Sequence, residues 1–134
     1  MFEALDISVS GLVAQRERLT AISGNIANFE TILNEQGAYE PYQRRVPIFA
    51  VGDPTSGTDL GVHVKAIELD SGAPMLRYEP GNPYADDAGY VGYPNISIPT
   101  EMMNAMEASR AYEANITASE AVKSMYSIAL QLLG

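Results

Sequence analysis

Residues 99–133 read PTEMMNAMEASRAYEANITASEAVKSMYSIALQLL, with no glycine and no proline after the first residue. Pro99 suits the first position of a helix, and the carboxylate of Glu101 suits the positive end of the helix dipole. Apolar and small side chains recur at steps of three and four, the period of one helix face. The stretch predicts a helix from about residue 100 to residue 133, with a face formed by Ala105, Ala108, Tyr112, Ile116, Val122, Tyr126, Ala129 and Leu133.

This helix is too long for a compact protein of 134 residues. At about 1.5 Å per residue it spans roughly 50 Å, whereas a compact chain of this length has a diameter of about 36 Å. The helix must therefore protrude or belong to an assembly. An apolar face at both ends of the chain favours assembly.

The N-terminal residues 1–30 predict a second helix. Leu5, Leu12, Leu19 and Ile26 recur at a spacing of seven, and Val9 and Ile22 fall three or four positions away. This spacing is typical of a helix that packs along a seam. Gly11 and Gly24 lower helix propensity. Three explanations are open: another backbone approaches closely, the helix forms only when it packs on a partner, or the two glycines are simply tolerated in a surface helix.

Residues 31–98 contain nearly all of the turn signals, including seven of the eight prolines. Val46–Val51 predicts a short edge strand, and residues 61–69 predict a second strand with a bulge near Ala66, where the apolar alternation changes phase. The fold class we expect is mainly α with a small β segment. Long terminal helices (1–30 and 99–134) pack as an antiparallel coiled coil around an irregular β-hairpin and loop region (31–98).

Composition excludes several classes of function. There is no cysteine, and His63 is the single histidine, so thiolate chemistry, zinc clusters and a serine–histidine relay are not expected. A formal charge of -9 opposes binding to nucleic acid. Apolar runs are too short to span a bilayer, and the acidic N-terminus does not resemble a secretory signal. We therefore expect no cofactor, no metal and no insertion into a membrane.

Three asparagines stand out within the helical segments. Asn25 and Asn28, followed by Thr31, suit a helix C-terminus, where Asn tolerates the left-handed conformation. Asn115 lies in the middle of the long helix, where Asn is disfavoured. It is either exposed and indifferent, or a polar residue that fixes the register between packed helices.

The segment Ser23–Thr31 resembles the N-terminal signature of bacterial flagellar rod and hook proteins, in which Asn-x-Ala-Asn leads to a threonine. Three further stretches narrow the resemblance to the flagellar basal-body rod protein family, and within it to the proximal-rod type. They are residues 42–46, residues 78–95 with the sequence Tyr-Glu-Pro-Gly-Asn-Pro, and residues 101–115. The resemblance spans essentially the whole chain.

The resemblance implies a structural subunit without enzyme activity, which polymerises into the periplasmic drive shaft of the flagellum. This shaft transmits torque and surrounds the export channel. The partners of the subunit would be copies of itself, rod proteins of the FlgB, FlgF, FlgG and FliE types and the inner face of the MS ring. It would meet the type III export machinery in transit, without a cleaved signal. The residues expected to mediate subunit contacts or to carry the family motif are Leu5, Leu12, Leu19, Asn25, Ile26, Asn28, Thr31, Tyr78, Glu79, Pro80, Gly81, Asn82, Pro83, Arg110, Tyr112, Asn115, Ile116, Tyr126, Leu130 and Leu133.

Other functions remain open at this point. Another axial rod or hook subunit would share the N-terminal signature. A small helical chaperone or adaptor of a secretion system would also be acidic, free of cysteine and amphipathic. A cell-wall-acting enzyme with paired carboxylates is a third possibility, although no carboxylate pair has a supporting sequence context.

Overall fold

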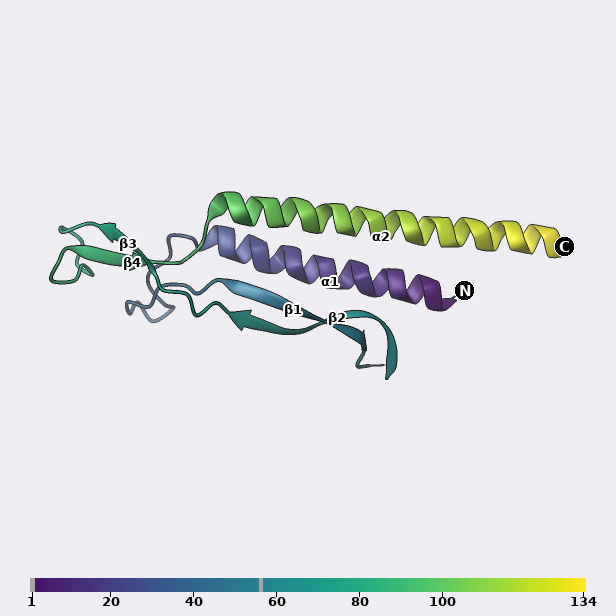
Figure 1. The fold of residues 1–134 in the computed structure, drawn as a ribbon, viewed down its shortest axis with the longest axis horizontal. Helices are drawn as coiled ribbons and strands as arrows, with labels where there is room; N and C mark the ends of the chain where they lie inside the picture. The colour runs from purple at the N-terminus through teal and green to yellow at the C-terminus, as the bar shows by residue number, and fades with distance from the viewer. Residues whose placement is uncertain (1, 56) are drawn as a thin grey trace.

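The computed structural model describes residues 2–55 and 57–134, and its elements lie in layers along one long axis (Figure 1). Helix α1 (Phe2–Ala27) and helix α2 (Ile98–Leu133) are antiparallel neighbours. Strands β1 (Arg45–Asp53) and β2 (Thr58–Leu69) form a hairpin that packs on α1, and strands β3 (Met75–Tyr78) and β4 (Tyr90–Tyr93) form a second ribbon at the far end. The expected fold class, mainly helical with a small β segment, is confirmed.

The two helices differ in length, and this sets the shape of one end. α1 has 26 residues and α2 has 36. The rings of Phe2 and Tyr126 lie 6.0 Å apart, so the first turn of α1 is level with residue 126 of α2. Residues 127–133 of α2 consequently project beyond α1, and Figure 1 shows this projection leading to the C-terminus.

Helix α2 begins close to where the sequence predicts, with Ser97 as its N-cap and Pro99 in its first turn. The predicted protrusion is confirmed, because about 54 Å of helix cannot be enclosed by a chain of 134 residues. Helix α1 ends at Ala27, where Asn28 donates from its side chain to the carbonyl of Gly24 over 2.8 Å. This bond caps the last turn. The helix ends where the asparagines predict, but the expected left-handed asparagine is not found, because none of the described residues other than glycine has a positive φ.

The β1–β2 hairpin contains the predicted bulge. Ile48 pairs with Ala66, but the next residue, Phe49, pairs with Val64, so Lys65 is left without a partner residue in the ladder. The extra residue lies beside Ala66, where the alternation of apolar and polar residues changes phase. Pro47 is accommodated because the two-stranded sheet leaves β1 as an edge strand. Strand β1 begins one residue earlier and ends two residues later than predicted.

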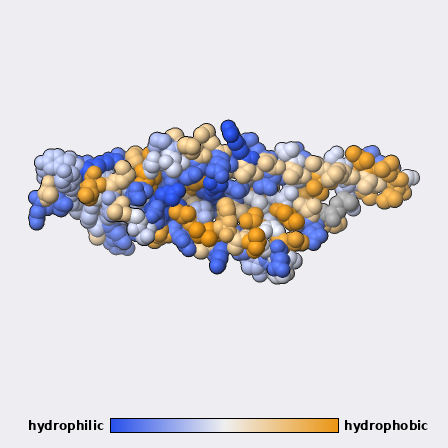
Figure 2. All heavy atoms as spheres, in the orientation of Figure 1, coloured by the Kyte–Doolittle hydropathy of each residue, from blue (hydrophilic) through white to orange (hydrophobic). Residues whose placement is uncertain are grey.

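Buried side chains are few and lie mainly between α1, α2 and the base of the hairpin. The fully or nearly fully buried apolar residues include Ala14, Ala21, Ile22, Val91, Ile96 and Ala108. Many large apolar side chains are exposed, and Figure 2 shows hydrophobic residues gathered at the end where α2 projects. Such exposure is typical of a protein that is completed by neighbouring chains.

Candidate assembly interface

The contact between α1 and α2 follows one stripe of α2, which we call the seam stripe. Its residues recur at alternating steps of three and four, the spacing of a coiled-coil seam. Most of them are buried or half-buried, and the two exposed ones are Tyr126, beside the first turn of α1, and Leu133, in the projecting part. The seam stripe consists of Ala105, Ala108, Tyr112, Asn115, Ser119, Val122, Tyr126, Ala129 and Leu133.

The seam stripe differs from the predicted face at one place. Ile116 was expected on the face toward the other helix, but it is 37% exposed. The corresponding positions are held by Asn115, which is half-buried, and by Ser119, which is buried. The sequence left Asn115 undecided and did not predict Ser119, because apolar character was used as the sign of contact. Small and polar residues allow a closer approach of the helices.

Asn115 fits against a glycine of α1. A Cβ atom built on Gly11 would lie 2.8 Å from Asn115 Nδ2 and 2.9 Å from Oδ1, so the absence of a side chain at Gly11 makes room for the amide. Asn115 Nδ2 donates to the carbonyl of Ala111 over 3.0 Å. The neighbour that approaches Gly11 closely is therefore a side chain and not the backbone that was predicted, and Asn115 belongs to the packed seam.

On α1, Leu5, Leu12, Leu19 and Ile26 are each half-buried, as their spacing of seven predicts. Ile22 is buried, but Val9 is 46% exposed and does not share their environment. Helix α1 must satisfy two neighbours, since α2 packs on one side and the β1–β2 hairpin on another. Its apolar positions are accordingly divided between two faces.

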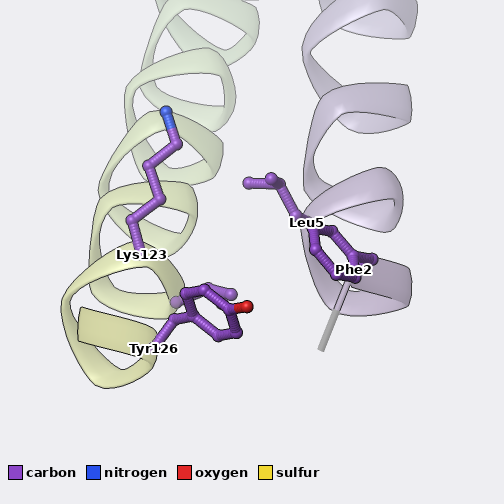
Figure 3. A pocket seen from close by; sticks show the side chains of 5 residues that line it. Phe2, Leu5, Lys123 and Tyr126 are labelled. Carbon is purple, nitrogen blue, oxygen red and sulfur yellow. The ribbon is translucent and has the colours of Figure 1, made fainter. Parts of the chain in front are cut away.

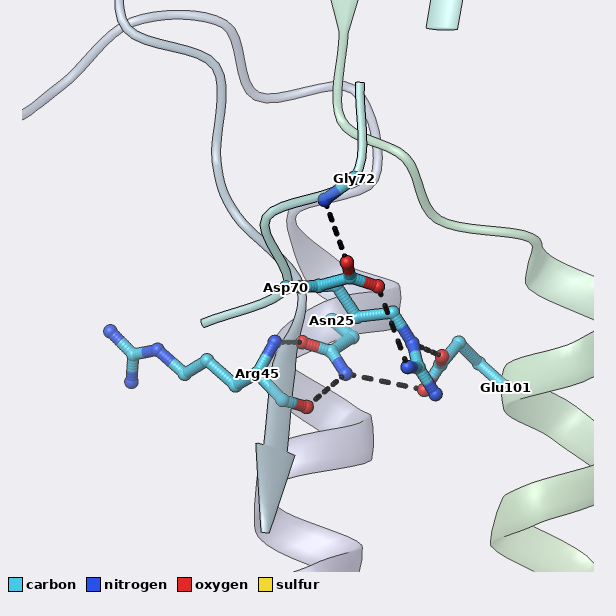
Figure 4. A network of polar contacts seen from close by, with 6 residues as sticks. Asn25, Arg45, Asp70, Gly72 and Glu101 are labelled. Carbon is cyan, nitrogen blue, oxygen red and sulfur yellow. Dashed lines mark hydrogen bonds and ion pairs between the residues drawn. The ribbon is translucent and has the colours of Figure 1, made fainter. Parts of the chain in front are cut away.

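A polar cluster joins the C-terminal part of α1, the start of β1 and the first turn of α2 (Figure 4). Glu101 is only 1% exposed, and its carboxylate accepts hydrogen bonds from Arg44 Nε and, over 3.2 Å, from Asn25 Nδ2. Asn25 also bonds both backbone groups of Arg45, accepting from its N–H at 2.8 Å and donating to its carbonyl at 2.9 Å. Arg44 lies 3.9 Å from a carboxylate oxygen of Asp70.

This cluster fixes the angle at which the chain leaves one helix and enters the other. A buried carboxylate is tolerated only when it is paired and hydrogen-bonded, and both conditions are met for Glu101. Sequence reasoning identified Asn25 but missed Glu101 and Arg44 as a pair. Glu101 was interpreted only through the helix dipole, and nothing local connects it to an arginine 57 positions away.

The motif Tyr78–Pro83 lies at the end of β3 and in the turn that follows, at the end of the molecule opposite to the two chain termini. Glu79 accepts hydrogen bonds from Asn82 Nδ2 at 3.0 Å and from the Tyr93 hydroxyl at 3.0 Å. Both bonds lower the pKa of Glu79, and the bond from Asn82 has the larger effect. The bond to Glu79 in turn raises the pKa of Tyr93. Gly89 has φ of 85°, and a Cβ there would lie 2.9 Å from the ring of Tyr78.

The remaining predicted contact residues fall into three environments. Asn28 and Thr31 join in a hydrogen bond of 3.1 Å at the end of α1. Tyr78, Pro80, Gly81 and Pro83 lie on the exposed turn of the motif, and Arg110 is exposed on α2. Near the C-terminus of α2, Tyr126 is 38% exposed beside Phe2, and in the projecting part Leu130 is 53% and Leu133 86% exposed.

The helix ends enclose a small apolar pocket of about 190 Å³ (Figure 3). It is lined by Phe2, Leu5, Val122, Lys123 and Tyr126, and Leu5 points from α1 toward α2. Among the described residues that line the pocket, Lys123 and Tyr126 are the titratable ones. It is therefore a gap in an apolar helix contact and offers no arrangement for acid–base or nucleophilic chemistry.

Two further features bear on the class of protein. Within residues 2–55 and 57–134, no group of three or more metal-ligating side chains comes together. None of the described helices combines the length and the apolar character needed to cross a membrane. The described residues form packed helices and expose many apolar side chains.

Comparison with known proteins points in the same direction. Residues 87–132 match a family described as "Flagellar basal body rod FlgEFG protein C-terminal". The chain is 40% identical over 126 residues to the flagellar basal-body rod protein FlgC of Escherichia coli O157:H7, covering 93% of this chain and 92% of the relative. It is 38% identical over 150 residues to FlgC of Borreliella burgdorferi (99% and 97% covered), and 39% identical over 127 residues to FlgC of Aquifex aeolicus (94% and 92% covered).

Proposed function

The chain belongs to the FlgC family of flagellar basal-body rod proteins and is a structural subunit of that rod, and we propose that it builds the rod's proximal segment around the export channel. Membership in a family of structural proteins implies a role without enzymatic activity. The finer proposal concerns how the chain is used. The helical pair α1–α2 forms an inner layer, and the region between the helices forms an outer layer.

One observation supports this arrangement most directly. α2 is longer than any compact fold of this chain could enclose, and large apolar side chains on it are exposed, including Met125, Ile128 and Leu132. A surface helix with a single partner exposes mainly polar residues on its other faces. The exposed apolar residues therefore indicate further helices from neighbouring subunits around α2.

The rod requires contacts that do not close on themselves. A helical assembly is built from heterologous contacts, in which each subunit presents different surfaces to different neighbours. The chain offers the projecting end of α2 at one end and the β3–β4 ribbon at the other. We propose as neighbours copies of the chain itself, rod proteins of the FlgB, FlgF, FlgG and FliE types, and the inner face of the MS ring.

The proposed route to the rod is type III export in an unfolded state. The sequence has no cysteine, so no disulfide opposes unfolding. Isolated helices draw most of their stability from packing, so the helices are expected to be marginal before assembly. We propose that the chain is made in the cytoplasm, passes through the export channel without cleavage, and folds where α1 and α2 meet their neighbours.

The proposal is tested by complementation of a flagellated bacterium that lacks its own FlgC-type protein. Expression of this chain, or of a version with matched codons, is expected to restore basal bodies with a complete rod and to restore swimming. If the chain is exported but the basal bodies still lack a rod, the proposal is contradicted. The relative from the host serves as the positive control in the same strain.

A further inference from the structure

The two edges of the β3–β4 ribbon, at the end of the molecule opposite to the chain termini (Figure 1), differ in their hydrogen bonds. On the outer edge of β4, the Tyr39 hydroxyl accepts from the N–H of Gly92 over 2.9 Å and donates to its carbonyl over 3.0 Å. The Asp86 carboxylate accepts from the N–H of Tyr90 over 2.8 Å, and the N–H of Asp86 donates to the Tyr90 carbonyl over 2.9 Å. The backbone groups of Gly92 and Tyr90 therefore point away from β3, and the edge of β4 is closed.

The pairing register shows which backbone groups of β3 point outward. Leu76 pairs with Gly92, and Tyr78 pairs with Tyr90. In an antiparallel ladder, two residues opposite each other either exchange both hydrogen bonds or direct their backbone groups outward. Since Gly92 and Tyr90 direct theirs outward, Leu76 and Tyr78 do so as well. Among the described residues, none forms a hydrogen bond with the N–H or C=O of Leu76 or Tyr78, so the edge of β3 is open.

An open and exposed edge is a site at which another strand can add. All of β3 is exposed, and Leu76 and Tyr78 are each 66% exposed. Edges are commonly protected by a proline or a bulge. Strand β1 contains Pro47 and β2 has its bulge at Lys65, whereas β3 contains no proline and pairs with β4 without a register shift. The sequence of β3 therefore leaves its edge available.

One face of the ribbon is apolar beside this edge. Residues opposite each other in a ladder share a face, so Leu76, Tyr78 and Tyr90 lie on the same face. The rings of Tyr78 and Tyr90 lie 5.3 Å apart, in an edge-to-face arrangement. A strand that adds to β3 continues this face, and apolar side chains suit the positions beside Leu76 and Tyr78.

The other face of the ribbon carries Arg77 between two carboxylates. Arg77 Nη1 lies 3.1 Å from the Glu30 carboxylate, and its guanidinium lies over the ring of Tyr93, 4.2 Å from the centroid. The Tyr93 hydroxyl donates to the Glu79 carboxylate over 3.0 Å. One arginine therefore serves a face on which two carboxylates lie.

The charge of this end of the molecule indicates what the added strand carries. Residues 28–43 and 70–97 contain seven acidic residues and one basic residue, which is Arg77. Like charges repel, so the same end of a second copy is disfavoured as the partner. A strand with basic side chains beside Glu30 and Glu79 is attracted instead.

The basic residues of a second copy are not placed for this contact. Arg44 and Arg45 are adjacent, but their backbone groups are engaged: Asn25 bonds both groups of Arg45, and the Arg44 carbonyl accepts from the N–H of Asp70 over 2.8 Å. Lys65 belongs to β2, which contains more acidic than basic residues. The other basic residues outside the ribbon lie on α1 and α2. The complementary strand therefore belongs to a different protein.

We propose that the open edge of β3 accepts an extended segment of another protein, in which basic and apolar residues alternate. Its apolar residues lie beside Leu76 and Tyr78, and its basic residues lie beside Glu30 and Glu79. Backbone hydrogen bonds to Leu76 and Tyr78 hold the segment, and the alternation of its side chains gives specificity. The inference goes beyond the proposed function and does not rest on it, because it follows from the ribbon alone.

Hydrogen exchange of the full chain, followed by NMR, tests the proposal with the peptide acetyl-Lys-Val-Lys-Val-Lys-Val-Lys-amide as the probe. Among the described elements, β3 and β4 contact each other and no helix, so the test does not require assembled helices. Without the peptide, the amides of Met75 and Arg77 should be protected by β4, and those of Leu76 and Tyr78 should exchange rapidly. When about nine-tenths of the chain has bound the peptide, exchange at Leu76 and Tyr78 should be about tenfold slower. Unchanged exchange at both residues would overturn the proposal.

Control peptides separate strand addition from attraction by charge alone. A peptide with glutamate in place of lysine should not bind, and equal binding of this peptide would overturn the proposal. Two further peptides are N-methylated at the valines or at the lysines, which removes the backbone donors of one edge or the other. One of them should bind about tenfold more weakly or worse, and unchanged binding of both would overturn the proposal. Slower exchange at Leu76 and Tyr78 in the concentrated chain without peptide would identify a second copy as the partner and also overturn it.

A matched pair of substitutions tests the edge of the protein itself. Leu76→Pro removes one outward N–H but no bond of the β3–β4 ladder, whereas Leu76→Val keeps the N–H with a side chain of similar size. Leu76→Pro is expected to bind the peptide about tenfold more weakly than Leu76→Val, the effect of one hydrogen bond. Protection of Met75 and Arg77 in both variants confirms that the ribbon is folded, and equal affinities would then contradict the proposal. Incorporation into the rod is scored separately, so a chain that builds rods but does not bind the peptide refutes only this inference.

Discussion

Gly11 and Asn115 face each other across the contact between α1 and α2, and a Cβ atom on Gly11 would come within 2.8 Å of the Asn115 amide nitrogen. This relationship explains both residues at once. A glycine inside a helix costs about 1 kcal/mol relative to alanine, and an asparagine inside a helix is also disfavoured. Each is tolerated because the other is present.

The first prediction is a coupling between these two positions. Gly11→Ala alone gains helix propensity but displaces the Asn115 amide from its bond to Ala111, so little net stabilisation is expected. In an Asn115→Ala background the same substitution meets no amide and should stabilise by about 1 kcal/mol. Urea unfolding followed by circular dichroism, at a concentration where the helices are formed, measures the double-mutant cycle. Additive effects would show that the two residues do not interact.

The second prediction concerns the buried carboxylate of Glu101. Glu101→Ala removes the partner of Arg44 and one acceptor of Asn25, and loss of one member of a buried pair typically costs about 3–5 kcal/mol. The matched control is Glu107→Ala, which removes an exposed pair with Arg18 on the same helix. Exposed pairs contribute about 0–1 kcal/mol. If the free energies of unfolding of the two variants differ by less than about 1 kcal/mol, the cluster does not hold the helices together.

The third prediction follows from the opposite pKa shifts of Glu79 and Tyr93. The lowered pKa of Glu79 means that its contribution to stability is present above its unfolded pKa and is lost as pH falls through the folded value. The raised pKa of Tyr93 means that its contribution is present below its unfolded pKa, near 10, and is lost as pH rises through the folded value. Tyr93→Phe is expected to raise the pKa of Glu79, as measured by carboxyl NMR. No change would show that the hydrogen bond is not formed in solution.

The reciprocal experiment titrates the tyrosines. Glu79→Gln should return the pKa of Tyr93 toward that of an ordinary tyrosine, and the signal of Tyr93 is assigned by its loss in Tyr93→Phe. Asn82→Ala is a useful third variant, because the Asn82 bond is the largest cause of the lowered pKa of Glu79. Its effect on Glu79 should be at least as large as that of Tyr93→Phe.

The fourth prediction concerns the projecting end of α2. A chain that stops after Ser124 lacks Tyr126, which contacts the ring of Phe2, as well as the exposed Leu130 and Leu133. Its polar cluster around Glu101 is untouched, so the truncated chain should still form the helical pair. We expect it to be absent from isolated basal bodies, whereas a chain lacking only Gly134 should be present. Incorporation of the longer truncation would show that this end makes no essential contact.

Both helices and the β1–β2 hairpin could be predicted because their signals are local. Pro99 marks the start of α2, the seven-residue spacing marks α1, and the change of phase near Ala66 marks the bulge. The β3–β4 ribbon was not predicted as paired strands, since each has only four residues and the segment between them is rich in turns. Pairing over such a distance leaves no periodic signal in a single sequence.

The candidate interface was predicted in part for similar reasons. Leu5, Leu12 and Leu19 follow a periodic pattern, so their partial burial could be expected. The exchange of Ile116 for Asn115 could not, because the fit depends on Gly11 of the other helix. The pair of Glu101 and Arg44 likewise joins segments that only the folded chain brings together.

The central claim is that the α1–α2 pair forms the inner layer of the proximal rod. A cryo-electron microscopy map of basal bodies from a strain that depends on this chain tests it most directly. The account predicts density for α1 and α2 beside the export channel, running roughly along the rod axis, with the β1–β2 hairpin farther out. Density that places the helical pair on the outer surface, or a rod that does not contain the chain, would contradict it.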